Sequence, residues 1–134
     1  MRPLLAVFVG GLVGTSLRLT IELALPHGPT QFPASTLGIN LVGALALGFL
    51  VARMWPVAAP WLRAGVGTGL LGSFTTFSAL AVALATLTDD GQWMLALLYL
   101  AISMLGGLAA AWLGLRLGRR DDRAQSSTPD LVSE

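Results

Sequence analysis

The fold is decided by the stretch Gly65-Val-Gly-Thr-Gly-Leu-Leu-Gly-Ser-Phe-Thr-Thr-Phe-Ser78, which interrupts a long apolar segment. Each glycine lowers helix propensity by about 1 kcal/mol relative to alanine, and the serines and threonines at 73–78 can cap broken helix ends. This pattern predicts a break in a helix. The alternative is that the glycines only let neighbouring helices pack closely, as small residues do in membranes.

A break inside hydrocarbon has chemical consequences. It is tolerated only where protein buries it or water reaches it, because each unpaired backbone group costs several kcal/mol. The carbonyls that it frees are available to a cation, and the freed N–H groups to an anion. The stretch is therefore the first candidate for an ion site.

The composition is that of an integral membrane protein. The 134 residues are 54% hydrophobic and 11% charged, whereas a soluble domain has about 25% charged residues. The mean hydropathy is +0.75 and the formal net charge is +1, so the lipid bilayer, and no nucleic acid, is the expected partner. The chain has neither cysteine nor lysine, which excludes disulfides, thiolate metal sites and Schiff-base chemistry.

The length and the apolar runs predict an all-α domain with four transmembrane helices. The spans are expected at about 3–25, 33–53, 62–87 and 93–117, with the third helix broken near its middle. Together they form a single domain over residues 1–118. The tail at 119–134 is polar and free of aromatic residues, so it is expected to be disordered.

Polar side chains inside the first two spans are candidates for a site. Arg18 lies well within the first span, where an arginine usually faces a cavity or a partner. Snorkelling to the headgroups and an i, i+4 pair with Glu22 are the alternatives. Asn40 in the second span either joins two helices by hydrogen bonds or offers N–H donors to an anion and its oxygen to a cation.

A polar seam is predicted on the fourth span. Tyr99, Ser103 and Gly107 recur every four residues and so share one helix face. Such a seam serves either as packing contact or as the wall of a conduit.

Three ordered motifs carry a family resemblance. They are Gly10-Gly-Leu-Val-Gly14-Thr-Ser-Leu-Arg18, then Thr36-Leu-Gly-Ile-Asn40-Leu-Val-Gly43, then Gly69-Leu-Leu-Gly72-Ser-Phe-Thr-Thr-Phe77-Ser78. In order and spacing the sequence resembles the Fluc/CrcB fluoride channels. The resemblance implies a four-helix subunit that assembles as an antiparallel pair, passes fluoride passively out of the cell and holds a central structural Na⁺. The backbone carbonyls of Gly72 and Thr75 match the family's Na⁺ positions.

Fluoride is small and strongly hydrated, so its pathway must replace water with hydrogen-bond donors. Suitable groups are carried by an amide, three hydroxyls, an aromatic ring edge and a fixed positive charge. The residues expected along this anion pathway are Asn40, Ser78, Tyr99, Ser103, Phe77 and Arg18.

The sequence departs from the family pattern after Ser78. Where the family usually continues with threonine and phenylalanine, this chain has Ala79 and Leu80. One hydroxyl and one anion-facing ring are missing, so two equivalent pores in a symmetric dimer are put in question.

The arginines predict an orientation. The N-terminus, the 53–63 link and the tail share one side, and the opposite side has no arginine. The first side carries Arg2, Arg53, Arg63, Arg116, Arg119, Arg120 and Arg123. This bias predicts a multi-pass protein of the cell membrane with both termini in the cytoplasm. An antiparallel dimer then pairs this chain with an inverted copy of itself or, as the bias favours, with an oppositely oriented paralogue.

Three rival functions follow from the same residues. A small multidrug exporter needs a carboxylate deep in the membrane, and Glu22 near the end of the first span is the sole candidate. An enzyme needs a nucleophile and a base, but cysteine is absent and the single histidine, His27, lies in a Pro-Gly turn, so no enzyme is expected. A structural, non-conducting partner subunit of a heterodimeric fluoride channel is the main alternative, because each polar residue also has a packing role.

Overall fold

The computed structural model describes residues 1–26, 28 and 31–119, and over these residues every regular element is helical. Three spans are continuous: α1 (Arg2–Ala24), α2 (Ala34–Arg53) and α6 (Trp93–Gly118). The remaining span, Pro60–Asp89, consists of α3 (Pro60–Arg63), η1 (Ala64–Leu71), α4 (Gly72–Phe74) and α5 (Phe77–Asp89). The all-α fold class is confirmed. His27 and the tail from 120 onward lie outside the described residues.

All four spans are long and apolar enough to cross a membrane. Their large apolar side chains face outward: Leu4 of α1 is 75% exposed and Leu105 of α6 is 69% exposed. A water-soluble chain would bury such residues, whereas hydrocarbon solvates them. The protein is therefore a multi-pass membrane protein whose outer surface is matched to lipid.

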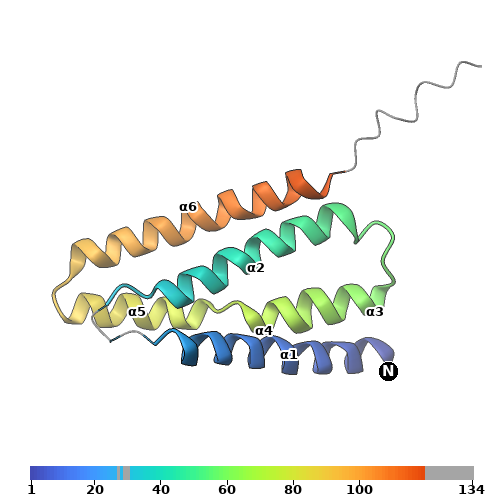
Figure 1. Ribbon diagram of the computed structural model, residues 1–134, viewed down its shortest axis with the longest axis horizontal. Coiled ribbons are helices and arrows are strands. Elements are labelled where there is room, and N and C mark those ends of the chain that lie inside the picture. Colours follow the sequence, from blue (N-terminus) through green and yellow to red (C-terminus); the bar gives the residue numbers. More distant parts are fainter. Residues whose placement is uncertain (27, 29–30, 120–134) are drawn as a thin grey trace, which may run out of the picture.

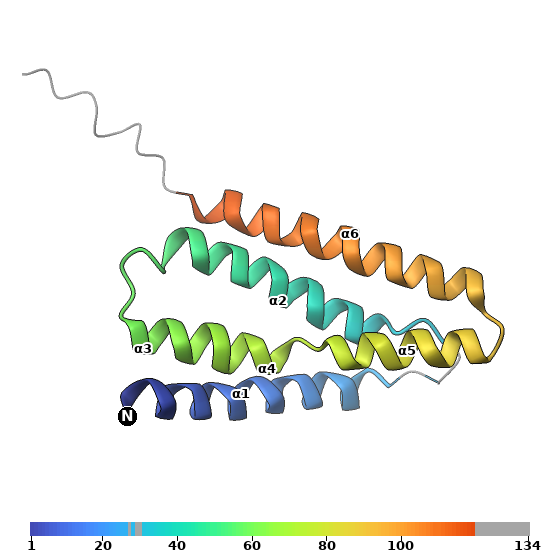
Figure 2. The same ribbon diagram turned by 180° about the vertical axis from the view of Figure 1, so that it is seen from behind.

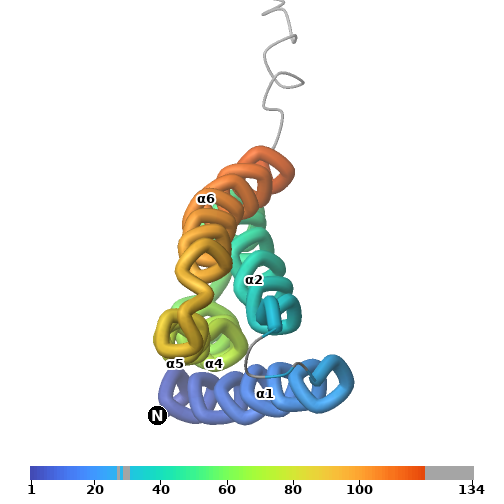
Figure 3. Tube along the Cα trace, turned by 90° about the vertical axis from the view of Figure 1, so that its left-hand side faces the viewer, coloured from blue at the N-terminus to red at the C-terminus, as the bar shows by residue number. Residues whose placement is uncertain are grey.

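The helices form two closely packed groups. The most extensive packing joins α2 to α6, and the next joins α1 to η1 and α4 (Figure 1). Seen end-on, α1 lies below the row formed by α4 and α5, and α6 and α2 lie on the other side of that row (Figure 3). Between α2 and α6, Gly48 faces the carbonyl of Ala111 and Gly114 faces the carbonyl of Leu45, with no room for a Cβ at either glycine. Small residues thus set the helix spacing.

Different helix termini lie at the two ends of the bundle. One end holds the starts of α1 and α3 and the ends of α2 and α6 (Figure 2). The other end holds the α5–α6 turn, where Gly91 has φ 75°. That backbone conformation favours glycine, so Gly91 suits this turn.

The glycines of the third span do not themselves break the helix. Residues Ala64–Leu71 form the π-helix η1, and the chain leaves helical geometry only after Phe74. Gly65 and Gly69 are buried, and a Cβ on Gly69 would lie 2.6 Å from the carbonyl oxygen of Val7 in α1. Close packing, the alternative for these glycines, therefore describes Gly65 and Gly69, and the break lies in the threonine part of the stretch.

Candidate functional site

The break in the third span consists of Thr75 and Thr76, both extended, with ψ of 156° and 120°. The Thr76 hydroxyl accepts a hydrogen bond from the N–H of Ala79 at 3.2 Å and so caps the start of α5. The Thr75 hydroxyl donates to the carbonyl of Leu71 at 2.9 Å, at the end of the preceding helix. The predicted capping role of hydroxyls in this stretch is confirmed at Thr76.

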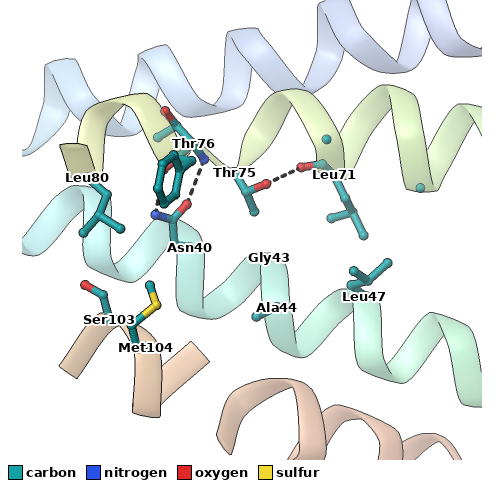
Figure 4. Close-up of a pocket in the computed structure, with 13 residues that line it drawn as sticks. Asn40, Gly43, Ala44, Leu47, Leu71, Thr75, Thr76, Leu80, Ser103 and Met104 are labelled. Carbon is teal, nitrogen blue, oxygen red and sulfur yellow. Dashed lines mark hydrogen bonds between the residues drawn. The ribbon is translucent and has the colours of Figure 1, made fainter. Parts of the chain in front are cut away.

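Asn40 of α2 holds the break in place. Its Nδ2 donates to the carbonyl of Thr76 at 3.0 Å, and its Oδ1 accepts from the N–H of Thr76 at 2.8 Å (Figure 4). The amide therefore pairs both backbone groups of one residue of the break, which would otherwise be unpaired in an apolar setting. The second N–H of the Asn40 amide takes no part in these two hydrogen bonds.

The break separates several carbonyls from their helical donors, among them those of Gly72 and Thr75. In an uninterrupted helix, the carbonyl of Gly72 would accept from the N–H of Thr76, and that of Thr75 from the N–H of Ala79. Here Thr76 donates to Asn40 instead, and Ala79 donates to the Thr76 hydroxyl. Both oxygens have therefore lost their helical donors, and carbonyls freed by a broken membrane helix are of the kind that can coordinate Na⁺.

Side chains offer no alternative metal site in the part of the chain that the structure describes. No group of three or more His, Cys, Asp or Glu residues there is arranged to hold a metal ion. A cation at the break would have to use oxygens other than carboxylates, from the backbone or from hydroxyl and amide groups.

A cavity of about 390 Å³ lies beside the break. Its walls come from α2, η1, α4, α5, α6 and the break itself (Figure 4). Five of the residues predicted for the anion pathway or the cation site line it: Asn40, Gly72, Thr75, Phe77 and Ser103. The sequence prediction thus selected residues from four separate elements and the break that meet in one place.

One wall of this cavity lies at the surface of the single chain. Phe77 lines the cavity and yet is 76% exposed, and Gly72 is also exposed. Ser78, next to Phe77, is exposed as well, and its Oγ lies 3.1 Å from the Thr76 hydroxyl oxygen. Ser78 therefore belongs to the hydrogen-bond network of the break and not to the cavity lining.

Tyr99 lies close to the cavity but behind its lining. Its side chain is fully buried, and its ring packs edge-on against Phe32 with centroids 5.4 Å apart. The Tyr99 and Ser103 hydroxyls are buried one helical turn apart and interact with each other, and neither has a hydrogen-bond partner outside this pair among the described residues. A hydrogen bond between the two hydroxyls uses only one of their two hydrogens, so the pair still has one donor for a polar species.

Arg18 does not line the cavity beside the break. It is partly buried in α1, and its Nε is buried without a hydrogen-bond partner. The structure therefore leaves the positive charge of Arg18 in α1, apart from the other predicted site residues.

Leu80 and Gly43 were noted in the sequence, but their contacts at the site were not predicted. Leu80 is only 3% exposed and lines the cavity, and its position three residues after Phe77 on one helix face was the available signal. Gly43 lies against the methyl group of Thr75, so closely that a Cβ could not be added. That contact joins residues of α2 and the break, and no local pattern indicates it.

Four apolar spans, a broken third helix and a cavity that collects several polar groups at the break define the class: a small multi-pass membrane protein. The family described as CrcB-like protein, Camphor Resistance (CrcB), has a sequence model that matches residues 5–115. The chain belongs to this family.

Curated relatives cover most of the chain. The fluoride-specific ion channel FluC of Pseudomonas putida is 45% identical over 117 residues, which span 85% of this chain and 94% of the relative. FluC of Azotobacter vinelandii is 44% identical over 116 residues, or 84% and 94% of the two chains. The fluoride-specific ion channel FluC 2 of Geobacillus kaustophilus is 38% identical over 116 residues, or 82% and 88%.

Proposed function

We propose that this chain is a passive, fluoride-selective channel that exports fluoride from the cytoplasm and so lowers its intracellular concentration. The observation that carries the proposal is the cavity beside the helix break, where hydrogen-bond donors, an aromatic ring and freed backbone groups meet within an apolar bundle. Relatives named fluoride-specific ion channels match along nearly their whole length. The family is a channel family, so the chain is not an enzyme.

The proposed pathway replaces the water around fluoride with donors from the protein. Asn40, whose second N–H is a free donor, and Ser103 line the cavity, and the buried Tyr99 hydroxyl lies beside Ser103, one helical turn away. The exposed ring of Phe77 presents its positive edge to an anion. Ser78 contributes a further hydroxyl, and Arg18 supplies an attractive charge along the approach.

A structural Na⁺ is proposed at the break, bound by the carbonyls of Gly72 and Thr75. Its support is the loss of both helical donors to side-chain acceptors. Bound there, the cation would neutralise partial negative charge on the two oxygens and hold the ends of α4 and α5 in place. Replacing Na⁺ by N-methylglucamine is expected to lower both the melting temperature and the fluoride flux of the protein. If neither the melting temperature nor the fluoride flux changed on this exchange, the proposed Na⁺ site would be wrong.

We propose that two subunits pair in antiparallel fashion. The exposed Gly72, Phe77 and Ser78 support this, because a second subunit covering them would close the open wall of the cavity. The second subunit is an inverted copy of this chain or, as the arginine bias favours, an oppositely inserted paralogue. The location proposed is the cell membrane, with both termini in the cytoplasm.

The rival functions have less support. The relatives that match the chain are themselves named channels, which does not favour a purely structural, non-conducting subunit. The acidic residues among those described are Glu22, Asp89 and Asp90, and none of them lines the cavity. A proton-coupled multidrug exporter would need a carboxylate there.

The direct test is fluoride efflux from liposomes that contain this chain alone. In detergent no membrane imposes an orientation, so subunits can pair in antiparallel fashion before reconstitution. We expect rapid loss of fluoride from these liposomes, measured with a fluoride electrode, while chloride is retained. A folded dimer that releases fluoride no faster than protein-free liposomes would overturn the proposal.

A further inference from the structure

A second depression lies far from the helix break. It is a groove of about 490 Å³ between the first turns of α1 and α3, lined by Arg2, Leu5, Ala6, Val9 and Trp61, and it is here called the α1–α3 groove. Leu5 is 63% exposed, Val9 57% and Trp61 46%, so the groove opens outward and is not covered by the chain itself. It shares no lining residue with the cavity beside the break.

The groove combines one positive charge with an apolar floor. Arg2 stands at its outer end, and Leu5 and Val9 continue from Arg2 along α1 toward the membrane interior. Trp61 forms the opposite wall at the start of α3, and tryptophan is typical of the membrane–water boundary. This order of charge, boundary and apolar surface matches the order of headgroup, glycerol and acyl chain in a phospholipid.

The charge of Arg2 is not matched within the described part of the chain. The acidic residues there are Glu22, late in α1, and Asp89 and Asp90 at the α5–α6 turn, which lies at the opposite end of the bundle (Figure 2). Of the four other described arginines at this end, Arg63 and Arg116 are engaged within the chain, and Arg53 and Arg119 do not line the groove. Arg63 Nε donates to the carbonyl of Ala58 at 2.8 Å, and the Arg116 guanidinium lies 3.9 Å from the centre of the Trp112 ring.

We propose that the α1–α3 groove binds an anionic phospholipid, with the phosphate on Arg2 and one acyl chain along Leu5 and Val9 beside Trp61. Charge complementarity selects the occupant, because a basic residue at the membrane surface attracts anionic lipids. The proposal does not depend on what ion the chain conducts.

The test compares phosphatidylglycerol with phosphatidylcholine that has the same acyl chains. Purified full-length chain is incubated with an equimolar mixture of the two lipids, and native mass spectrometry counts the lipids that each protein retains. We expect the unaltered chain to retain phosphatidylglycerol in preference, and Arg2→Gln to reduce that preference about fivefold. Arg119→Gln is the matched control, because it removes one charge at the same end outside the groove. Trp61→Ala is expected to weaken retention of both lipids.

Three outcomes would overturn the assignment. Equal retention of the two lipids by the unaltered chain would show that the groove does not select an anion. Equal losses in Arg2→Gln and Arg119→Gln would show a general attraction to the basic end. If the unaltered chain showed no lipid preference and Arg2→Gln no longer formed a dimer, the groove would instead be a contact surface for a second copy of the chain.

Discussion

At the scale of single residues, Gly43 supports the break because it has no side chain where Thr75 packs against α2. Its missing Cβ makes room for the methyl group of Thr75, whose hydroxyl bonds to the end of the preceding helix. One turn earlier, Asn40 pairs both backbone groups of Thr76. Two positions on one face of α2 therefore hold the two residues of the break.

This arrangement predicts a difference between two glycines of α2. A methyl group at Gly43 would contact Thr75 and lie 3.5 Å from Phe74, whereas at Gly38 it would meet nothing within 4 Å. Gly43→Ala is expected to lower the free energy of unfolding in detergent by about 1–3 kcal/mol, because the break must shift. Gly38→Ala is expected to be neutral or stabilising by up to about 1 kcal/mol. Equal effects of the two substitutions would contradict the packing described here.

The sequence identified Asn40 as informative but could not name its partner. An amide in hydrocarbon must find hydrogen bonds, and that much follows from its type and depth. The partner, Thr76, lies 36 positions along the chain, and the contact depends on how α2 crosses the third span. The sequence left open whether Asn40 joins two helices or serves an ion, and the structure shows that one of its N–H groups and its oxygen join α2 to the break.

At the scale of elements, the third span separates packing from interruption. The glycine-rich half forms η1 and lies against α1, and the threonine pair behind it leaves helical geometry. Propensity alone predicted a break somewhere in residues 65–78, because it counts glycines without knowing what they face. The π-helix η1, which packs against α1, could not be predicted in this way.

The same contact predicts different outcomes at two adjacent glycines of α1. A Cβ at Gly10 would contact the carbonyl oxygen of Gly65 and lie 2.9 Å from the amide of Leu70, both of which are backbone groups that cannot rotate away. A Cβ at Gly11 would lie 3.4 Å from the Ser73 hydroxyl, an ordinary contact.

Gly10→Ala is therefore expected to separate α1 from η1 and to lower the free energy of unfolding by about 1–3 kcal/mol, and Gly11→Ala is expected to have little effect. Unfolding in detergent followed by circular dichroism measures both variants. If Gly11→Ala lowered the free energy of unfolding more than Gly10→Ala did, the face of α1 that packs against η1 would not be the one that carries Gly10.

At the scale of the whole molecule, charge is divided between the two ends of the bundle. Among the described residues, the end that gathers the starts of α1 and α3 carries Arg2, Arg53, Arg63, Arg116 and Arg119, and the α5–α6 turn carries Asp89 and Asp90 (Figure 1). Orientation in a membrane follows such a distribution of arginines. The sequence alone predicted this asymmetry, because it requires only the number and order of the spans.

The asymmetry predicts a cytoplasmic C-terminus. The chain contains no cysteine, so Glu134→Cys provides one reporter for a membrane-impermeant thiol reagent. We expect this cysteine to be protected in intact cells and to react after the cells are opened. Reaction of about half of the molecules in intact cells would indicate dual insertion and would favour pairing with an inverted copy over pairing with a paralogue.

The central claim, that fluoride crosses through the cavity beside the break, is tested most directly by filling that cavity. Ala44 of α2 lines it, and Ala46 of the same helix is likewise partly buried but does not. The measurement is fluoride efflux from liposomes that contain Ala44→Phe or Ala46→Phe, each first shown to be a folded dimer. The account predicts that Ala44→Phe releases fluoride no faster than protein-free liposomes, while Ala46→Phe retains efflux. Equal, undiminished efflux from both variants would contradict it.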